Sequence, residues 1–114
     1  MSSTDISAPT EPISMTTPAD LDETVSAYDI VLVDFYADWC GPCQMMEPTL
    51  NQLAADTDAA ILKVDVDQFQ GLAAEYGVQG IPTLLVFAEG ELANRLVGAQ
   101  TADALAEEIA AHST

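Results

Sequence analysis

The sequence predicts an α/β fold with a central mixed β-sheet and helices on both faces. Short, strongly apolar runs alternate with segments of helical spacing, an order typical of strand–helix–strand units. The last two apolar runs are separated by a glycine turn without a helix, which predicts an antiparallel hairpin. The chain has 114 residues, 49% of them hydrophobic, which is sufficient for one domain with its own core.

The N-terminal stretch differs in composition from the rest. It is rich in Ser, Thr and Pro, so we interpret residues 1–16 as a flexible tail, with a weak edge strand near 13–15, and 17–114 as the folded domain. The stretch has no positive charge and no apolar run follows it, so we expect no signal peptide. No segment approaches the roughly 20 apolar residues of a membrane span. We therefore expect a cytoplasmic protein.

The first helix and the first central strand have clear signals. Thr17 as N-cap and Pro18 at the first helical position predict a helix that ends near residue 28. Residues 30–36 are almost continuously apolar, which predicts a strand buried on both faces. Asp34 is the exception within this strand.

A longer helix and a second central strand follow. Helical spacing over 42–56, with Met45 among the apolar positions, predicts a helix that Pro48 should kink. Residues 61–66 form the next apolar run, and a short helix is expected from Gln70 to Tyr76.

The C-terminal third is predicted to contain the hairpin and a final helix. Gly77 is expected just beyond the end of the preceding helix. Strands at 84–87 and 92–97 are joined by a turn in which Gly90 supplies a positive φ. Thr101 is expected to cap the last helix.

The motif WCGPC at 39–43 holds both cysteines of the chain, where a strand passes into a helix. Free N–H groups at a helix start stabilise a thiolate, so the pKa of Cys40 should fall. Cys43 lies close enough to attack a mixed disulfide formed by Cys40. Gly41 is expected to permit the tight turn, and Pro42 to stiffen it. The motif therefore indicates a thiol–disulfide oxidoreductase.

Three other interpretations of the cysteines compete with this one. A zinc site needs four ligands, and apart from the two cysteines the chain has only His112 in its C-terminal segment. A cysteine protease needs a His base beside the nucleophile, and none lies near the motif. Two inert buried cysteines remain as the third alternative. We expect no metal and no bound cofactor. The redox-active group is expected to be the disulfide Cys40–Cys43.

Other residues near the motif have two interpretations each. Asp34 is either buried, with a raised pKa that suits proton transfer to or from Cys43, or solvated at a strand end. Lys63 either lies beside Asp34 and pairs with it, or is a surface lysine. Trp39 either forms an apolar docking surface with Ile81 and Val97, or packs in the core.

The base rate predicts a trans peptide bond before Pro82, since only about 5–6% of X–Pro bonds in folded proteins are cis.

The charge balance is extreme, with 19 acidic residues against two basic ones and a net charge of −17. Such a chain should repel nucleic acid and anionic membranes, so we expect neither as a partner. In concentrated salt the Debye length shrinks to about 3 Å at 1 M, which screens the repulsion between acids. We therefore interpret the composition as adaptation to a salty cytoplasm; the alternative is an ordinary acidic protein.

Several separated motifs resemble the thioredoxin family over about residues 17–112. Residues 34–43 resemble the active-site stretch of that family, and residues 80–83 its substrate-loop motif. The order and spacing of four further positions agree as well: Lys63, Asp67, Gly90 and Gly98.

The resemblance implies a thioredoxin fold and a monomeric protein-disulfide reductant recharged by a thioredoxin reductase. Cys40 would be the exposed nucleophile, Cys43 the buried resolving thiol, and Asp34 the proton acceptor. Lys63 would lie beside Asp34 as a fourth catalytic residue. Pro82 would be cis and pack against the disulfide, with the Ile81 backbone pairing to the target. The substrate-binding residues implied are Trp39, Gly41, Pro42, Ile81, Pro82 and Gly98.

The chain departs from the family pattern at two positions. Tyr36 stands where a second Trp is common, and Gln44 where a Lys is frequent, which removes a cation that would favour the Cys40 thiolate. Two other functions remain open: a thiol oxidase or isomerase, and a non-catalytic subunit of a larger assembly. Gly41 and Pro42 between the cysteines favour the reductant, because oxidising relatives often have a His there.

Overall fold

The structure is a computed structural model that describes residues 8–113. Its core is a five-stranded sheet in the order β1-β3-β2-β4-β5. The strands are β1 (Ile13–Ser14), β2 (Ile30–Tyr36), β3 (Ala60–Asp65), β4 (Thr83–Ala88) and β5 (Glu91–Val97). The first three run parallel to one another, whereas β4 is antiparallel to β2 and β5 to β4. The mixed sheet is therefore confirmed, including the short edge strand within the predicted tail.

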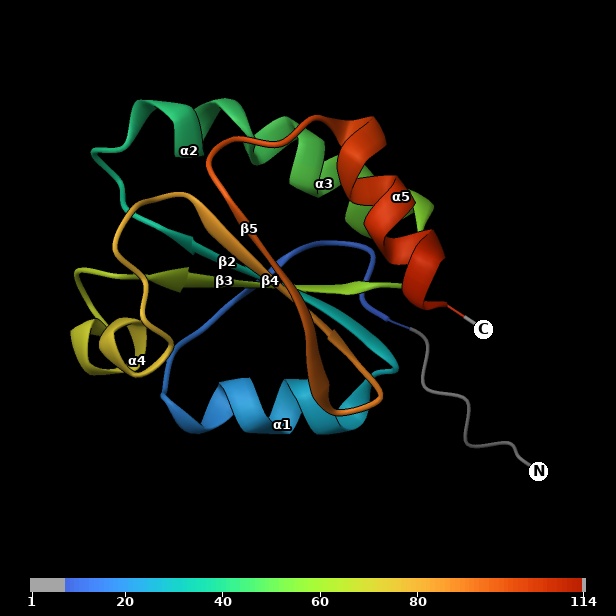
Figure 1. The fold of residues 1–114 in the computed structure, drawn as a ribbon, viewed down its shortest axis with the longest axis horizontal. Helices are drawn as coiled ribbons and strands as arrows, with labels where there is room; N and C mark the ends of the chain where they lie inside the picture. The colour runs from blue at the N-terminus through green and yellow to red at the C-terminus, as the bar shows by residue number, and fades with distance from the viewer. Residues whose placement is uncertain (1–7, 114) are drawn as a thin grey trace.

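The helices cover both faces of this sheet. Helices α1 (Ala19–Ala27) and α4 (Gln70–Glu75) lie on one side, and α2 (Gly41–Met45), α3 (Glu47–Asp56) and α5 (Ala102–His112) on the other (Figure 1). Two hydrophobic clusters fill the spaces between the sheet and these two layers. Helix α2 follows β2 after residues 37–40, which places the cysteine motif at the C-terminal end of the central strand.

Strand β2 explains the orientation of Asp34. Alternate side chains of a strand point to opposite faces. Val33 and Phe35 belong to the cluster with α1 and α4, whereas Leu32 belongs to the cluster with α3 and α5. Asp34 is in phase with Leu32, so its side chain points to the face covered by α2, α3 and α5.

The predicted start of the first helix is wrong by one residue. Helix α1 begins at Ala19, and the Thr17 hydroxyl caps no helical N–H. Instead the Asp20 carboxylate accepts hydrogen bonds from the backbone N–H groups of Thr16 and Thr17, at 2.8 and 3.0 Å. These bonds lower the pKa of Asp20. They also tie the first turn of α1 to the residues that precede it.

The long helix over 42–56 is divided rather than merely kinked. Helix α2 ends at Met45 and α3 begins at Glu47, with Pro48 in its first turn. A proline in a first turn removes no hydrogen bond, so the break lies before Pro48. Met45, expected on the apolar side, is 80% exposed, whereas Met46 is buried.

The C-terminal predictions are confirmed. Both residues of the hairpin turn, Glu89 and Gly90, have positive φ values of 53° and 85°. This combination matches the twist of the strands that the turn joins. Gly77 has φ 67°, and the Thr101 hydroxyl accepts a hydrogen bond from Ala104 N–H in the first turn of α5.

Cations neutralise few of the acids in the structure. Within residues 8–113 Lys63 forms an ion pair with Glu47 at 3.4 Å, and His112 lies 3.5 Å from Glu108, a contact that is ionic only with a protonated imidazole. Two charges 10 Å apart repel by about 0.4 kcal/mol in water without salt. Summed over the acids, this repulsion opposes folding by an amount on the order of several kcal/mol.

We expect the free energy of unfolding to fall steeply as KCl is removed. Salt screens repulsion between exposed acids, so stability should be greatest in molar KCl and decrease by several kcal/mol at about 0.01 M, where the Debye length is about 30 Å. Urea unfolding at a series of KCl concentrations measures this dependence. Stability that stays constant down to low KCl would contradict salt adaptation.

Candidate active site

The two cysteines form a disulfide at the junction of β2 and α2. Cys40 is the N-cap of α2 and Cys43 lies in its first turn, with Cα atoms 5.3 Å apart. The backbone N–H of Cys43 donates to Cys40 Sγ at 3.2 Å. A donor directed at one sulfur stabilises negative charge there, so the geometry favours a thiolate at Cys40.

The two cysteines do not differ in exposure as the family resemblance implied. Cys40 is 4% exposed and Cys43 3% exposed in this disulfide form, so the expectation of an exposed Cys40 is wrong. They form a small cluster with Ala37, against which Tyr36, Val66 and Ile81 pack. These neighbours cover both residues, and hydrogen bonding rather than exposure distinguishes them.

Gly41 is not required by the geometry of the turn. It is exposed, its φ lies outside the left-handed region, and an added Cβ would meet nothing within 4 Å. The expectation that glycine permits a tight turn here is therefore wrong. Gly41 leaves open space next to the disulfide-bonded Cys40. Pro42, the next residue, is exposed as well.

Asp34 is buried in β2, the strand that leads into the motif, which excludes the solvated interpretation. It is 1% exposed, and its Oδ1 has no hydrogen-bond partner. Burial raises the pKa of Asp34 to about 7; Lys63 lowers it and Glu47 raises it. A carboxyl group with this pKa can accept or release a proton near neutral pH.

Lys63 does not form the expected ion pair with Asp34. The two residues are register partners on β3 and β2, but the Lys63 ammonium pairs with Glu47 at 3.4 Å. It also lies 4.5 Å from the centre of the Tyr36 ring. The lysine side chain is 15% exposed, so the surface interpretation is wrong too.

The peptide bond between Ile81 and Pro82 is cis. The base-rate expectation of trans is wrong, and the expectation from the family resemblance is confirmed. The Pro82 carbonyl accepts a hydrogen bond from Gly98 N–H at 2.8 Å. Gly98 has φ 92°, a conformation that favours glycine, so this contact holds the loop against the end of β5.

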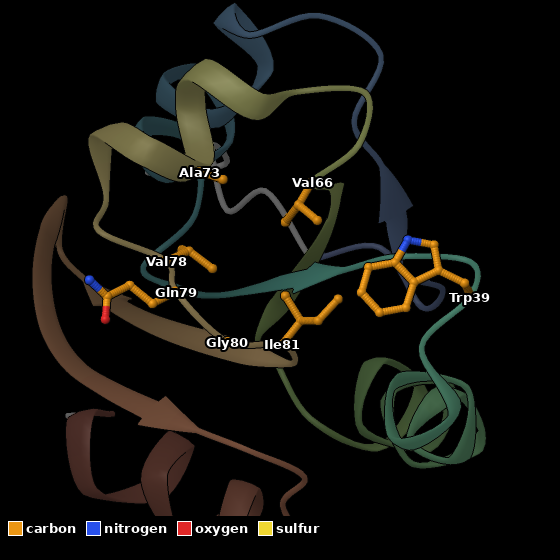
Figure 2. Close-up of a pocket in the computed structure, with 7 residues that line it drawn as sticks. All are labelled: Trp39, Val66, Ala73, Val78, Gln79, Gly80 and Ile81. Carbon is orange, nitrogen blue, oxygen red and sulfur yellow. The ribbon is translucent and has the colours of Figure 1, made fainter.

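A shallow apolar hollow of about 190 Å³ lies beside the disulfide. Figure 2 shows the side chains around it, with the indole of Trp39 at one side and Ile81 next to it. Trp39 is 71% exposed, which excludes core packing, and Val97, also exposed, does not line the hollow. The Trp39 Nε1 donates to Asp67 at 2.8 Å, which holds the ring at this side of the hollow.

Several residues of this region were not recognised from the sequence. Asp67 matched the family pattern, but nothing indicated that it binds the Trp39 indole. Glu47 gave no signal, because the predicted helix over 42–56 placed it in the helix interior. The remaining lining residues resemble ordinary helix and loop positions: Val66, Ala73, Val78, Gln79 and Gly80. The Gln44 amide donates to the Asp38 carbonyl, a contact that ties α2 to the preceding loop.

The described part of the chain lacks two features, a cluster of metal ligands and a membrane-spanning helix. Within residues 8–113 no group of three or more His, Cys, Asp or Glu side chains is arranged to hold a metal ion. No helix in that part of the chain is long and apolar enough to cross a membrane.

An α/β fold with a disulfide at a strand–helix junction, a buried carboxyl group in the strand that leads into it and a cis-proline loop defines a thiol–disulfide oxidoreductase. Comparison with known proteins gives the same class. The Thioredoxin family model matches residues 12–111. A thioredoxin from Staphylococcus aureus is 48% identical over 98 residues, which cover 84% of this chain and 93% of that protein.

Solved structures agree closely. A point mutant of thioredoxin from Halobacterium salinarum NRC-1 superposes with a TM-score of 0.91 at 50% identity, covering 96% of both chains. Mitochondrial thioredoxin 3 from Saccharomyces cerevisiae, in its oxidised form, has a TM-score of 0.79 at 33% identity, covering 88% of this chain and 94% of that one.

The chain belongs to the thioredoxin family and is a protein-disulfide reductant. Thioredoxins use their own redox-active disulfide and generally work with a thioredoxin reductase and disulfide-containing targets. The Halobacterium relative supports the interpretation of the acidic surface as salt adaptation.

Proposed function

We propose that Cys40 attacks the target disulfide and that Cys43 resolves the resulting mixed disulfide. The observation that carries this assignment is the hydrogen bond from Cys43 N–H to Cys40 Sγ. This N–H group points at the sulfur of Cys40, so it would stabilise a thiolate on Cys40 and not on Cys43. A lowered thiol pKa is an established property of thioredoxins, and in this chain the hydrogen bond assigns the lowered pKa to Cys40.

The proposed reaction transfers two electrons to the target. The Cys40 thiolate attacks one target sulfur, and the target disulfide breaks to release a first thiolate, which takes a proton from water. Cys43 then loses its proton to the Asp34 carboxylate and attacks Cys40 Sγ. A new bond joins Cys40 to Cys43, the mixed disulfide breaks, and the second target sulfur leaves as a thiolate.

The surrounding residues divide into proton handling and target binding. Asp34 is proposed as the proton acceptor, with Lys63 as the cation that adjusts its pKa. The target chain is proposed to extend over the hollow beside Trp39 and to pair with the Ile81 backbone. Four further residues are proposed to form the border of this surface: Gly41, Pro42, Pro82 and Gly98.

The specific partners are proposed from the chemistry of the family and the charge. A thioredoxin reductase would return electrons to the disulfide, and disulfide-containing proteins would receive them. A net charge of −17 supports a protein that binds neither nucleic acid nor anionic membrane. We propose a monomer of the cytoplasm that acts without a bound cofactor or metal.

We expect the reduction potential of the Cys40–Cys43 pair to lie near −270 mV, the value known for thioredoxin. The measurement is an equilibrium with dithiol buffers in concentrated KCl. A potential of about −180 to −120 mV would indicate an oxidase or isomerase instead. Absence of a reversible couple would contradict both catalytic functions.

A matched double variant separates catalysis from a structural role in an assembly. Cys40→Ser with Cys43→Ser should lose all disulfide reduction. If the protein acts only as a structural subunit, its cellular function should survive this double substitution.

A further inference from the structure

The position of the Lys63 ammonium needs explanation, because the Asp34 carboxylate on the neighbouring strand could attract it. Lys63 and Asp34 are register partners on neighbouring parallel strands, which run about 4.8 Å apart. Both side chains point to the same face: Asp34 is in phase with Leu32 and Lys63 with Ile61, and Leu32 and Ile61 share one cluster. The Lys63 side chain is thus placed to reach Asp34, yet it forms no ion pair with it.

Two groups outside the buried site hold the ammonium instead. Glu47 Oε1 lies 3.4 Å from Lys63 Nζ, and the Tyr36 ring centre lies 4.5 Å from it. Glu47 can hold the ammonium because the helix is interrupted between α2 and α3. The break makes Glu47 the first residue of α3, where an acid is also favoured by the helix dipole.

We propose that Glu47 is a positioning residue that holds the Lys63 ammonium against the Tyr36 ring and so prevents it from pairing with the Asp34 carboxylate. Desolvation supports this arrangement. The Glu47 side chain is 52% exposed, so the ammonium keeps part of its hydration there. A pair with Asp34, which is 1% exposed, would require the ammonium to give up that hydration.

The titratable groups that act on Asp34 come from three elements. Lys63 faces it from β3, Glu47 from α3 and the Tyr36 hydroxyl from its own strand β2. Among these groups Lys63 is the one cation, so its distance controls the field at Asp34. A cation held at intermediate range leaves Asp34 basic enough to take the Cys43 proton, a consequence that rests on the proposed role of Asp34.

The test is a double-mutant cycle on the full chain in its oxidised form, at one fixed molar KCl concentration. Glu47→Gln is made in the natural background and in Lys63→Met, which keeps the length of the side chain. The titration midpoint of the Asp34 carboxyl is followed by carbon-13 NMR. Asp56→Asn, an exposed acid at the other end of α3, is the matched charge control.

Release of Lys63 should lower the Asp34 midpoint by about one pH unit in Glu47→Gln, because an opposite charge within about 4–6 Å lowers a carboxyl pKa by 1–3 units. In the Lys63→Met background the same substitution should shift the midpoint much less, and Asp56→Asn should shift it little in either background. Equal shifts in both backgrounds would overturn the proposal, since Glu47 would then act only through its own charge.

The readout does not depend on turnover, so it is separable from the proposed function. The ring-current shift of the Lys63 methylene protons should disappear in Glu47→Gln, and its retention would also overturn the proposal. If the midpoint moves as expected while the pH profile of mixed-disulfide resolution does not, Glu47 positions Lys63 and Asp34 is not the proton acceptor.

Discussion

Asp34→Asn should make the protein progressively more stable than the natural chain as the pH rises from 4 to 8. The pKa of Asp34 is about 7 in the folded protein and near 3.8 when unfolded. Between these values the folded protein keeps a proton that the unfolded chain releases, so the natural chain loses stability with rising pH. The loss is complete above pH 7 and amounts to about 4 kcal/mol, which the variant avoids.

The difference between the two unfolding curves is the quantity to measure, by urea denaturation of the oxidised proteins in molar KCl. Any packing cost of the amide is the same at every pH, so it cancels from the pH dependence of the difference. The exposed Asp56→Asn is the matched control and should show no comparable divergence. Parallel curves for Asp34→Asn would mean that burial does not perturb Asp34.

Cys43→Ser should convert the protein from a catalyst into a trap for its targets. Without the second sulfur, Cys40 still forms a mixed disulfide, but nothing in the motif can resolve it. Multiple-turnover reduction of a protein disulfide such as that of insulin should fall by about 10⁴-fold or more, a loss typical of removing a group that acts in covalent catalysis. Mass spectrometry should show the stoichiometric adduct.

The reciprocal variant shows which cysteine attacks. Cys40→Ser should lose both turnover and capture, because the remaining Cys43 lacks the N–H donor that stabilises a thiolate. Since the two cysteines are equally buried, exposure alone would not predict this asymmetry. Capture by Cys40→Ser, or sustained turnover by Cys43→Ser, would reverse the assigned roles.

Local sequence signals were sufficient for most of the fold. The apolar run of β2 was located to the residue, and the hairpin and the Thr101 cap were also correct, because each depends on neighbouring residues alone. The helix boundaries were less secure. Asp20 competes with Thr17 for the role of cap, and only the geometry of the first turn decides between them.

Parts of the site could not be predicted because they depend on long-range contacts. The cis and trans forms of an X–Pro bond differ by only about 0.5–1 kcal/mol, so the surrounding fold decides the isomer at Pro82. Lys63 could reach either Asp34 or Glu47, and Glu47 is brought near by the break before α3. The covering of Cys40 likewise needs Val66 and Ile81 from distant segments.

The placement of the basic residues has a practical consequence for biochemistry. Trypsin cleaves only after Lys or Arg, and this sequence offers Lys63 and Arg95 alone. Both peptide bonds lie within hydrogen-bonded strands, Lys63 in β3 and Arg95 in β5, where the arginine also donates to the Tyr76 carbonyl. A protease needs an unfolded segment, so tryptic cleavage of this protein reports the opening of the sheet itself, with no background from exposed loops.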